Sequence, residues 1–127
     1  MTHLQAVRDV LLASPEVVAL VDARVYPLVA PQGVARPFVV LTLVSAVPYH
    51  THTDVPADLL EAARVQVRTY GPEYVAVHAV AKAVDDVLGA LSGPVLSATR
   101  DNQSDGYEDE TSLHFVTADY FVHRSRD

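Results

Sequence analysis

Residues 63–73 read ARVQVRTYGPE, and this stretch joins a strand pattern to a helix start. Its first part alternates, with Arg64, Gln66 and Arg68 on one face and smaller or apolar residues on the other. Successive side chains of a strand point to opposite faces of a sheet. The alternation therefore predicts a half-exposed strand from Ala63 to Tyr70. The Gly-Pro-Glu that follows breaks the strand and opens a helix.

The helix after this stretch is the longest that the sequence predicts. Apolar residues recur at helical spacing from Val77 to about Leu91, and Gly93-Pro94 ends the run. Near the N-terminus, Ser14 followed by Pro15 is typical of a helix start. The other expected elements are a first helix around residues 4–11, a second helix over 15–21, a short extended piece after residue 24, a strand over 38–45, a loop over 47–60, a strand over 95–99, a polar loop over 101–110 and a strand over 113–123.

This order of elements predicts an α+β fold. We expect a small antiparallel or mixed sheet of about four to five strands packed against one long helix, with a short N-terminal helix pair. A chain of 127 residues has the size of one domain, so we assign residues 1–127 to a single domain.

Composition excludes several classes of protein. Half of the residues are apolar, and nine Lys/Arg against sixteen Asp/Glu give a net charge of −7. This charge argues against nonspecific nucleic-acid binding and against a polybasic membrane surface, because both depend on basic side chains. The absence of cysteine excludes disulfides, thiolate metal sites and a cysteine nucleophile. We expect neither a membrane span nor a signal peptide.

Two segments are candidates for metal ligation, and each has a plainer interpretation. His50 and His52 would point the same way in an extended segment, with Asp54 as a third ligand. Two solvated histidines in a polar loop are the favoured alternative. The segment 101–106 resembles part of a calcium loop, but Ser112 stands where that loop needs Glu, which favours a solvated hairpin loop. We therefore expect no metal and no cofactor.

The sequence contains no recognisable catalytic motif. It has neither a Gly-x-Ser-x-Gly elbow nor a glycine-rich phosphate loop. Glu108 and Glu110 would share one face of a strand, where solvated carboxylates are the ordinary interpretation. We expect that the protein is not an enzyme. Arg64 and Arg68 either bind an acidic partner surface or pair with acidic residues of the next strand, and we slightly favour pairing within the chain.

Several short segments together are more informative than any single motif. After the expected N-terminal helix pair they are Arg24-Val25-Tyr26-Pro27, Ala30-Pro31-Gln32-Gly33, Arg36-Pro37-Phe38-Val39-Val40, Arg64-Val65-Gln66-Val67 before one long helix, and Tyr107-Glu108 with Thr111 before the final strand. In this order, the chain resembles the tail-completion proteins of long-tailed bacteriophages and related prophages, also described as tail terminator or head–tail joining proteins. The resemblance covers nearly the whole chain. The family often has Ile at Val25 and Tyr at Phe38, and the loop from Pro48 to Leu60 matches nothing specific.

The resemblance implies a structural virion protein and not a catalyst. Such proteins form a ring, usually a hexamer, that caps the finished tail tube and docks to the connector proteins at the head portal. The implied location is the head-proximal end of the tail in the virion, after assembly in the bacterial host cytoplasm. The implied partners are other copies of the chain, the tail tube protein and the connector proteins, with no membrane.

Genome DNA would pass through the lumen of such a ring without specific binding. Acidic groups that face the lumen would keep the DNA from adhering. The alternatives are a head-completion adaptor or another phage assembly protein, or a generic cytoplasmic α+β binding domain. We expect contacts with other subunits or partners at His50, His52, Asp54, Arg64, Gln66, Arg68, Asp101, Asp105, Tyr107 and Glu108.

Overall fold

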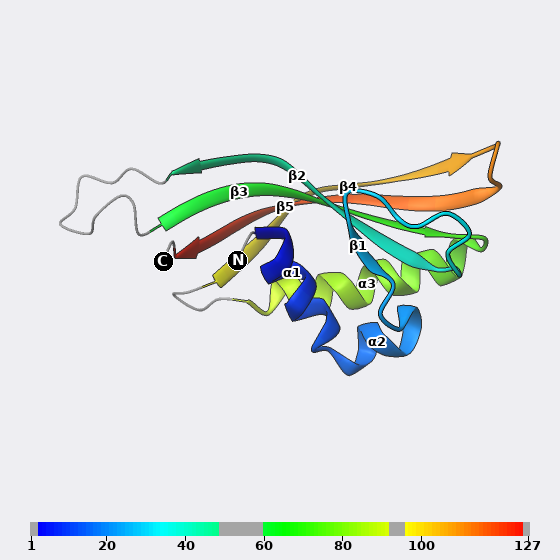
Figure 1. The fold of residues 1–127 in the computed structure, drawn as a ribbon, viewed down its shortest axis with the longest axis horizontal. Helices are drawn as coiled ribbons and strands as arrows, with labels where there is room; N and C mark the ends of the chain where they lie inside the picture. The colour runs from blue at the N-terminus through cyan, green and yellow to red at the C-terminus, as the bar shows by residue number, and fades with distance from the viewer. Residues whose placement is uncertain (1–2, 49–59, 92–95, 126–127) are drawn as a thin grey trace.

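The computed structural model describes residues 3–48, 60–91 and 96–125, and in this part of the chain three helices lie on one side of a five-stranded sheet (Figure 1). The helices are α1 (His3–Leu12), α2 (Pro15–Val21) and α3 (Tyr74–Gly89). The strands are β1 (Val25–Pro27), β2 (Phe38–Pro48), β3 (Leu60–Gly71), β4 (Leu96–Glu108) and β5 (Leu113–Ser125). The predicted α+β fold is confirmed.

The sheet is mixed, with β3 at its centre. The strand order is β1-β2-β3-β5-β4, in which β1 runs parallel to β2 and the other pairs are antiparallel. The alternation predicted for β3 is confirmed, because Val65 and Val67 are buried toward the helices whereas Arg64 and Arg68 lie on the other face. The sheet therefore has one apolar face under the helices and a second face that no helix covers, which we call the uncovered face. At one end of this second face, Ala30 and Val34 of the segment between β1 and β2 pack against Phe38, Val40 and Leu113.

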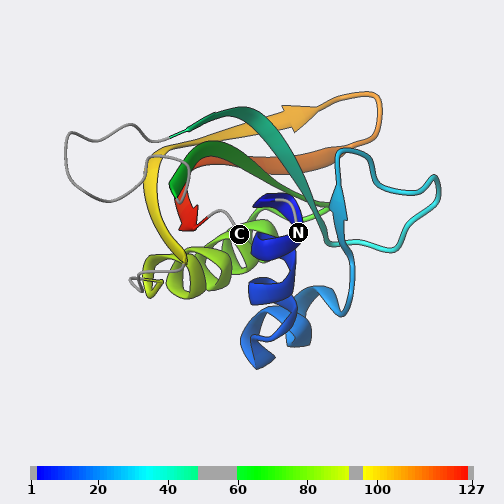
Figure 2. The same cartoon turned by 60° about the vertical axis from the view of Figure 1, so that its left-hand side comes forward.

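Two helices share the apolar face of the sheet. α1 contacts β1, β2 and β3, whereas α3 contacts β3, β5 and β4, and α2 packs against both helices (Figure 2). α3 is 16 residues long and ends at Gly89, slightly earlier than the expected Leu91. The Ser14 side chain accepts a hydrogen bond from the Val17 backbone N–H at the start of α2, as predicted. Among the residues that the structure describes, no helix has the length and apolar character that a membrane span requires.

The prediction of a polar loop over residues 101–110 is wrong for most of that segment. β4 continues to Glu108 and pairs with β5 along its length, so the turn covers only residues 109–112. The segment is polar because it forms the edge of the sheet, where residues 101–105 and 107–108 are exposed. The fragment that resembled a calcium loop is extended strand and does not form such a loop.

Tyr120 ties the sheet to α3. This β5 residue is almost completely buried, and its hydroxyl donates a hydrogen bond of 3.0 Å to Oδ1 of Asp85 on α3. The other oxygen of Asp85 lies 3.5 Å from Nη1 of Arg100 on β4. Burial, together with the bond to Asp85, raises the pKa of Tyr120 well above its ordinary value. One side chain thus connects three elements.

We predict that Tyr120→Phe lowers the free energy of unfolding by about 1 kcal/mol at neutral pH, because a buried hydrogen bond is lost. Urea denaturation followed by circular dichroism measures this change.

The pH dependence of the same pair of proteins gives a second measurement. Folding favours the neutral tyrosine, so the contribution of Tyr120 is fully present below its ordinary pKa of about 10 and declines as the pH rises above it. The stabilities of the parent and of Tyr120→Phe should therefore converge about one pH unit above 10. A difference that stays constant up to pH 11 would contradict the assignment.

Candidate interaction surface

The uncovered face of the sheet carries the polar side chains of β3. Residues that stand opposite each other in an antiparallel pair share a face, so the register defines rows across this surface. One row contains Thr42, Gln66, Asp119 and Asn102, from β2 to β4. These rows bring together residues that are far apart in the sequence.

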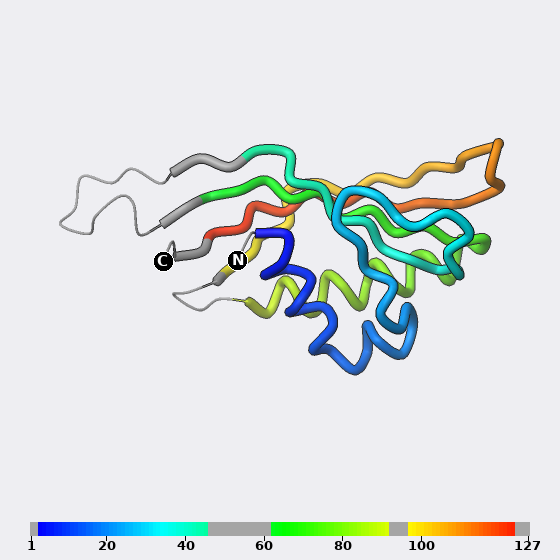
Figure 3. Tube along the Cα trace, in the orientation of Figure 1, coloured from blue at the N-terminus to red at the C-terminus, as the bar shows by residue number. Residues whose placement is uncertain are grey.

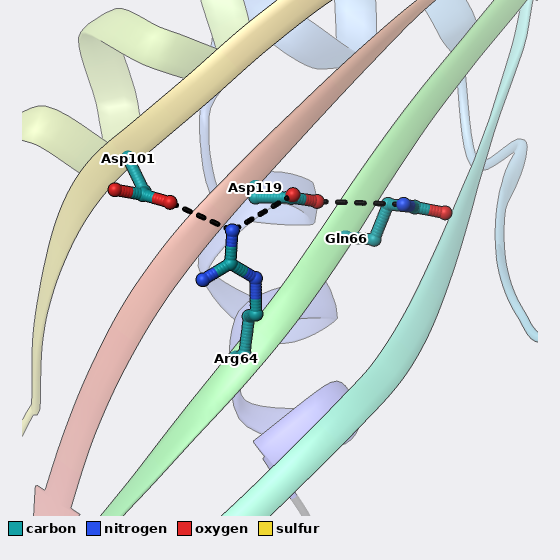
Figure 4. Close-up of polar contacts among 4 residues, drawn as sticks. All are labelled: Arg64, Gln66, Asp101 and Asp119. Carbon is teal, nitrogen blue, oxygen red and sulfur yellow. Dashed lines mark hydrogen bonds and ion pairs between the residues drawn. The ribbon is translucent and has the colours of Figure 1, made fainter.

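Arg64 is neutralised within the chain. Its Nη2 donates to Oδ2 of Asp101 at 2.7 Å and to Oδ2 of Asp119 at 3.2 Å (Figure 4). Gln66 donates to the other oxygen of Asp119 at 3.4 Å. The hydrogen bond with Asp101, followed by that with Asp119, raises the pKa of Arg64. The favoured interpretation, pairing within the chain, is confirmed for this arginine.

A bulge brings Asp101 to this arginine. In the pairing of β4 with β5, Arg100 stands opposite Tyr120 and Asn102 opposite Asp119, so Asp101 is an extra residue. A bulge redirects the side chain of the extra residue, and Asp101 reaches across β5 to Arg64 on β3 (Figure 4). Sequence reasoning did not identify Asp119, because its role depends on the register of β5 against β3.

Arg68 differs from Arg64 because it has no carboxylate partner in the described part of the chain. Its Nε donates to Oγ1 of Thr117 at 3.2 Å, and its Nη1 donates to the hydroxyl of Tyr70 at 3.2 Å. The guanidinium also lies over the Phe115 ring, 5.3 Å from its centroid. Arg68 is therefore a half-buried cation that is held by neutral groups.

Aromatic rings continue this surface beyond Arg68. Tyr70 stacks on Phe38 with 5.1 Å between ring centroids and meets Phe115 at 5.7 Å. Phe115 occupies the space above Gly106, where a Cβ atom would lie 2.2 Å from the ring. A groove of about 350 Å³ lies beside this row, under the segment that connects β1 to β2.

The other predicted contact residues lie elsewhere. Asp105 and Tyr107 point to the side of α3, where Asp105 accepts a 3.2 Å hydrogen bond from the Tyr74 hydroxyl. Glu108 accepts a hydrogen bond of 2.9 Å from Thr111 in the β4–β5 turn. The structure thus brings Arg64, Gln66, Arg68 and Asp101 together on one face. Glu108 lines the groove on the same face, beside Tyr70, whereas Asp105 and Tyr107 lie on the side of α3.

The candidates His50, His52 and Asp54 lie outside the described residues. Within residues 3–48, 60–91 and 96–125, no group of three or more His, Cys, Asp or Glu is arranged to hold a metal ion.

Comparisons with known proteins give a consistent result. The model of a family described as "Tail completion protein gp17" matches residues 5–122. A chain in a solved structure of the virion of a native gene transfer agent (GTA) particle has a similar fold, with a TM-score of 0.69 and 22% sequence identity. That similarity covers 98% of this chain and 95% of the other chain. No curated protein matches the chain in sequence.

We predict that Gly106→Ala destabilises the protein by about 1–3 kcal/mol, because the new methyl group must displace the Phe115 ring. Gly89→Ala is the matched control, since a Cβ at the end of α3 meets no atom within 4 Å. The control should be neutral or stabilising by up to about 1 kcal/mol, since alanine favours helix. Urea denaturation of the two variants compares them, and equal stabilities would contradict the packing described.

Proposed function

The chain belongs to the tail completion protein family, and we propose that it is a structural virion protein that completes a phage or phage-like tail at its head-proximal end. The observation that carries the proposal is the family match over residues 5–122, which runs from α1 into β5. The fold supports it, because the similarity to the GTA virion chain extends over nearly the full length of both chains. As a structural component, the protein would need no cofactor and perform no catalysis.

We propose that residues 1–127 act as one domain and that six copies close into a ring. A closed ring needs two different and complementary faces on each subunit. The sheet offers such a pair, because β1 with α1 lies at one edge and β4 with α3 at the other. At about 800 Å² for each face, a subunit would bury about 1,600 Å². This is about a fifth of the 7227 Å² accessible surface of the single chain.

The partners of this ring would be the tail tube protein on one side and the head–tail connector proteins on the other. We propose that the uncovered sheet face takes part through Arg68, because this cation has no carboxylate partner in the described part of the chain. Arg64 and Gln66 would shape the same face while remaining paired to Asp119. We also propose contacts with other subunits or partners at the remaining candidate residues, which are His50, His52, Asp54, Asp101, Asp105, Tyr107 and Glu108.

DNA would pass through the ring without specific binding. The net charge of −7 supports this, since phosphates are repelled by carboxylates. On the uncovered sheet face, Arg64 and Arg68 stand with Asp101 and Asp119, so this part of the surface is close to neutral. The helices carry exposed acids such as Asp9 and Glu16, so the helical layer is the better candidate for an acidic lumen. The ring would be assembled in the bacterial cytoplasm and remain in the virion.

Binding to tails that lack this protein tests the proposal. We predict that the added protein forms ring-shaped density at one end of each tail in negative-stain micrographs and restores joining to heads. An unrelated acidic protein of similar size and charge is the control and should leave the tails unchanged. Failure of the purified, folded protein to bind such tails would refute the proposed function.

A further inference from the structure

The edge of the sheet at β1 exposes apolar side chains. Leu28 and Val29, which directly follow β1, are 63% and 76% exposed. Beside them, a groove of about 200 Å³ lies between α1 and the end of β1 and is lined by Leu4, Gln5, Arg8, Pro27 and Leu28. Figure 2 shows the segment after β1 (blue to cyan) projecting away from the sheet. This edge therefore presents an apolar surface that the chain itself does not cover.

Three arginines surround this apolar surface. Nε of Arg8 donates to the Val25 carbonyl at 2.8 Å, and Nε of Arg24 donates to the Pro37 carbonyl at 2.9 Å. Arg36 is exposed. Among the described residues, none of the three arginines forms an ion pair with a carboxylate. We call this region, comprising Leu28, Val29, Arg8, Arg24 and Arg36, the arginine edge.

The opposite edge, at β4 and α3, also exposes apolar groups. Tyr74 and Tyr107 are about half exposed, and Val75 is 77% exposed. Here the surrounding charges are negative and come from Glu73, Asp105, Asp109 and Glu110, all of them exposed. Glu108 lines the same groove as Leu28, Val29 and Arg36 and is not part of this region. We call this region, with Tyr74, Val75 and Tyr107, the acidic edge.

One carboxylate of the acidic edge has a basic neighbour within the chain, because Nε2 of His78 lies 3.1 Å from Oδ1 of Asp105. Lys82 pairs with Asp86 at 2.9 Å, and Arg100 lies 3.5 Å from Asp85 and donates to Gln103. Both cations thus use carboxylates of α3 and leave those of the β4–β5 turn without an ion-pair partner in the described part of the chain. Figure 3 shows this turn (orange) and the segment after β1 (cyan) at the same end of the sheet.

We propose that the arginine edge of one copy binds the acidic edge of the next copy, with the exposed apolar side chains at the centre and arginine–carboxylate pairs around them. The inference rests on the proposed ring. An apolar centre with a polar rim is the usual anatomy of a protein interface. Opposite charges align the two surfaces and exclude the wrong pairing of like edges. The occupant is a second copy because the two surfaces belong to one chain, differ from each other and carry opposite charges, as head-to-tail association requires.

Charge reversal tests the pairing. One variant carries Arg36→Glu at the arginine edge together with Gln32→Glu at an exposed position of the same segment, and another carries Asp109→Lys and Glu110→Lys at the acidic edge. Each variant alone should assemble on tails at least tenfold more weakly than the parent, because its substituted positions would face side chains of the same charge on the next copy. An equimolar mixture of the two should assemble again, since the substituted edge of one variant then meets the oppositely charged substituted edge of the other, and unsubstituted edges meet each other.

Matched controls separate charge at the edges from charge in general. Lys82→Glu and Glu16→Lys change the charge in the same two directions at exposed positions of the helical layer, and they should assemble as the parent does. Circular dichroism verifies that every variant is folded.

Cross-linking provides a readout of which surfaces meet. The natural chain has no cysteine, so introduced cysteines are unique. The double variant Val29→Cys with Val75→Cys, treated with a flexible bis-maleimide on tails, should give a ladder of multimers beyond the dimer. Each single variant should remain monomeric.

The outcomes distinguish the two proposals. The edge pairing would be overturned if both charge-reversed variants form rings as readily as the parent, or if their mixture fails to assemble. Either result would leave the proposed tail function intact. Dimers from the single-cysteine variants would overturn it as well, because like edges would then meet. A parent protein that does not bind tails would refute the proposed function itself, and with it this inference.

Discussion

The register of β3 is the constraint on which the rest of the structure depends. β3 pairs with both β2 and β5 along most of its length, so each of its side chains is committed to one face of the sheet. A slip of one residue would turn Arg64 and Arg68 toward the helices and expose Val65 and Val67. Burying two arginines among apolar side chains would be far more costly than any alternative contact could offset. The same register places Asp119 beside Arg64 and Tyr120 beneath α3.

Much of this fold was predictable, because the elements that cover the core carry clear patterns. The alternation in β3, the apolar run in β2 and the Ser14-Pro15 helix start each result from a local physical preference, and each prediction agrees with the structure. β4 was partly missed because residues 101–105 have no apolar alternation. Its pairing with β5 keeps this segment extended, and that information lies in the partner strand and not in the segment itself.

The candidate surface was predictable only in part. The shared face of Arg64, Gln66 and Arg68 follows from strand geometry alone. Their partners do not, because Asp101 reaches Arg64 through a bulge and Asp119 through the register of another strand. The exposed apolar residues that flank the two edges were missed for a similar reason. Leu28 and Val75 look like ordinary core residues in sequence, and only the tertiary structure shows that nothing in the described part of the chain covers them.

The strands β2 and β4 each contain a bulge, and the two bulges lie at the same level of the sheet. Val44 is an extra residue in β2 and Asp101 is one in β4, and these positions lie on either side of the pair formed by Val65 and Tyr120. β4 is an edge strand that combines a bulge with charged side chains, and such a strand is a poor template for another strand. The β4 edge of a single copy is therefore protected against open-ended pairing with further strands. Side chains, and not backbone ladders, would then decide where one copy may join the next.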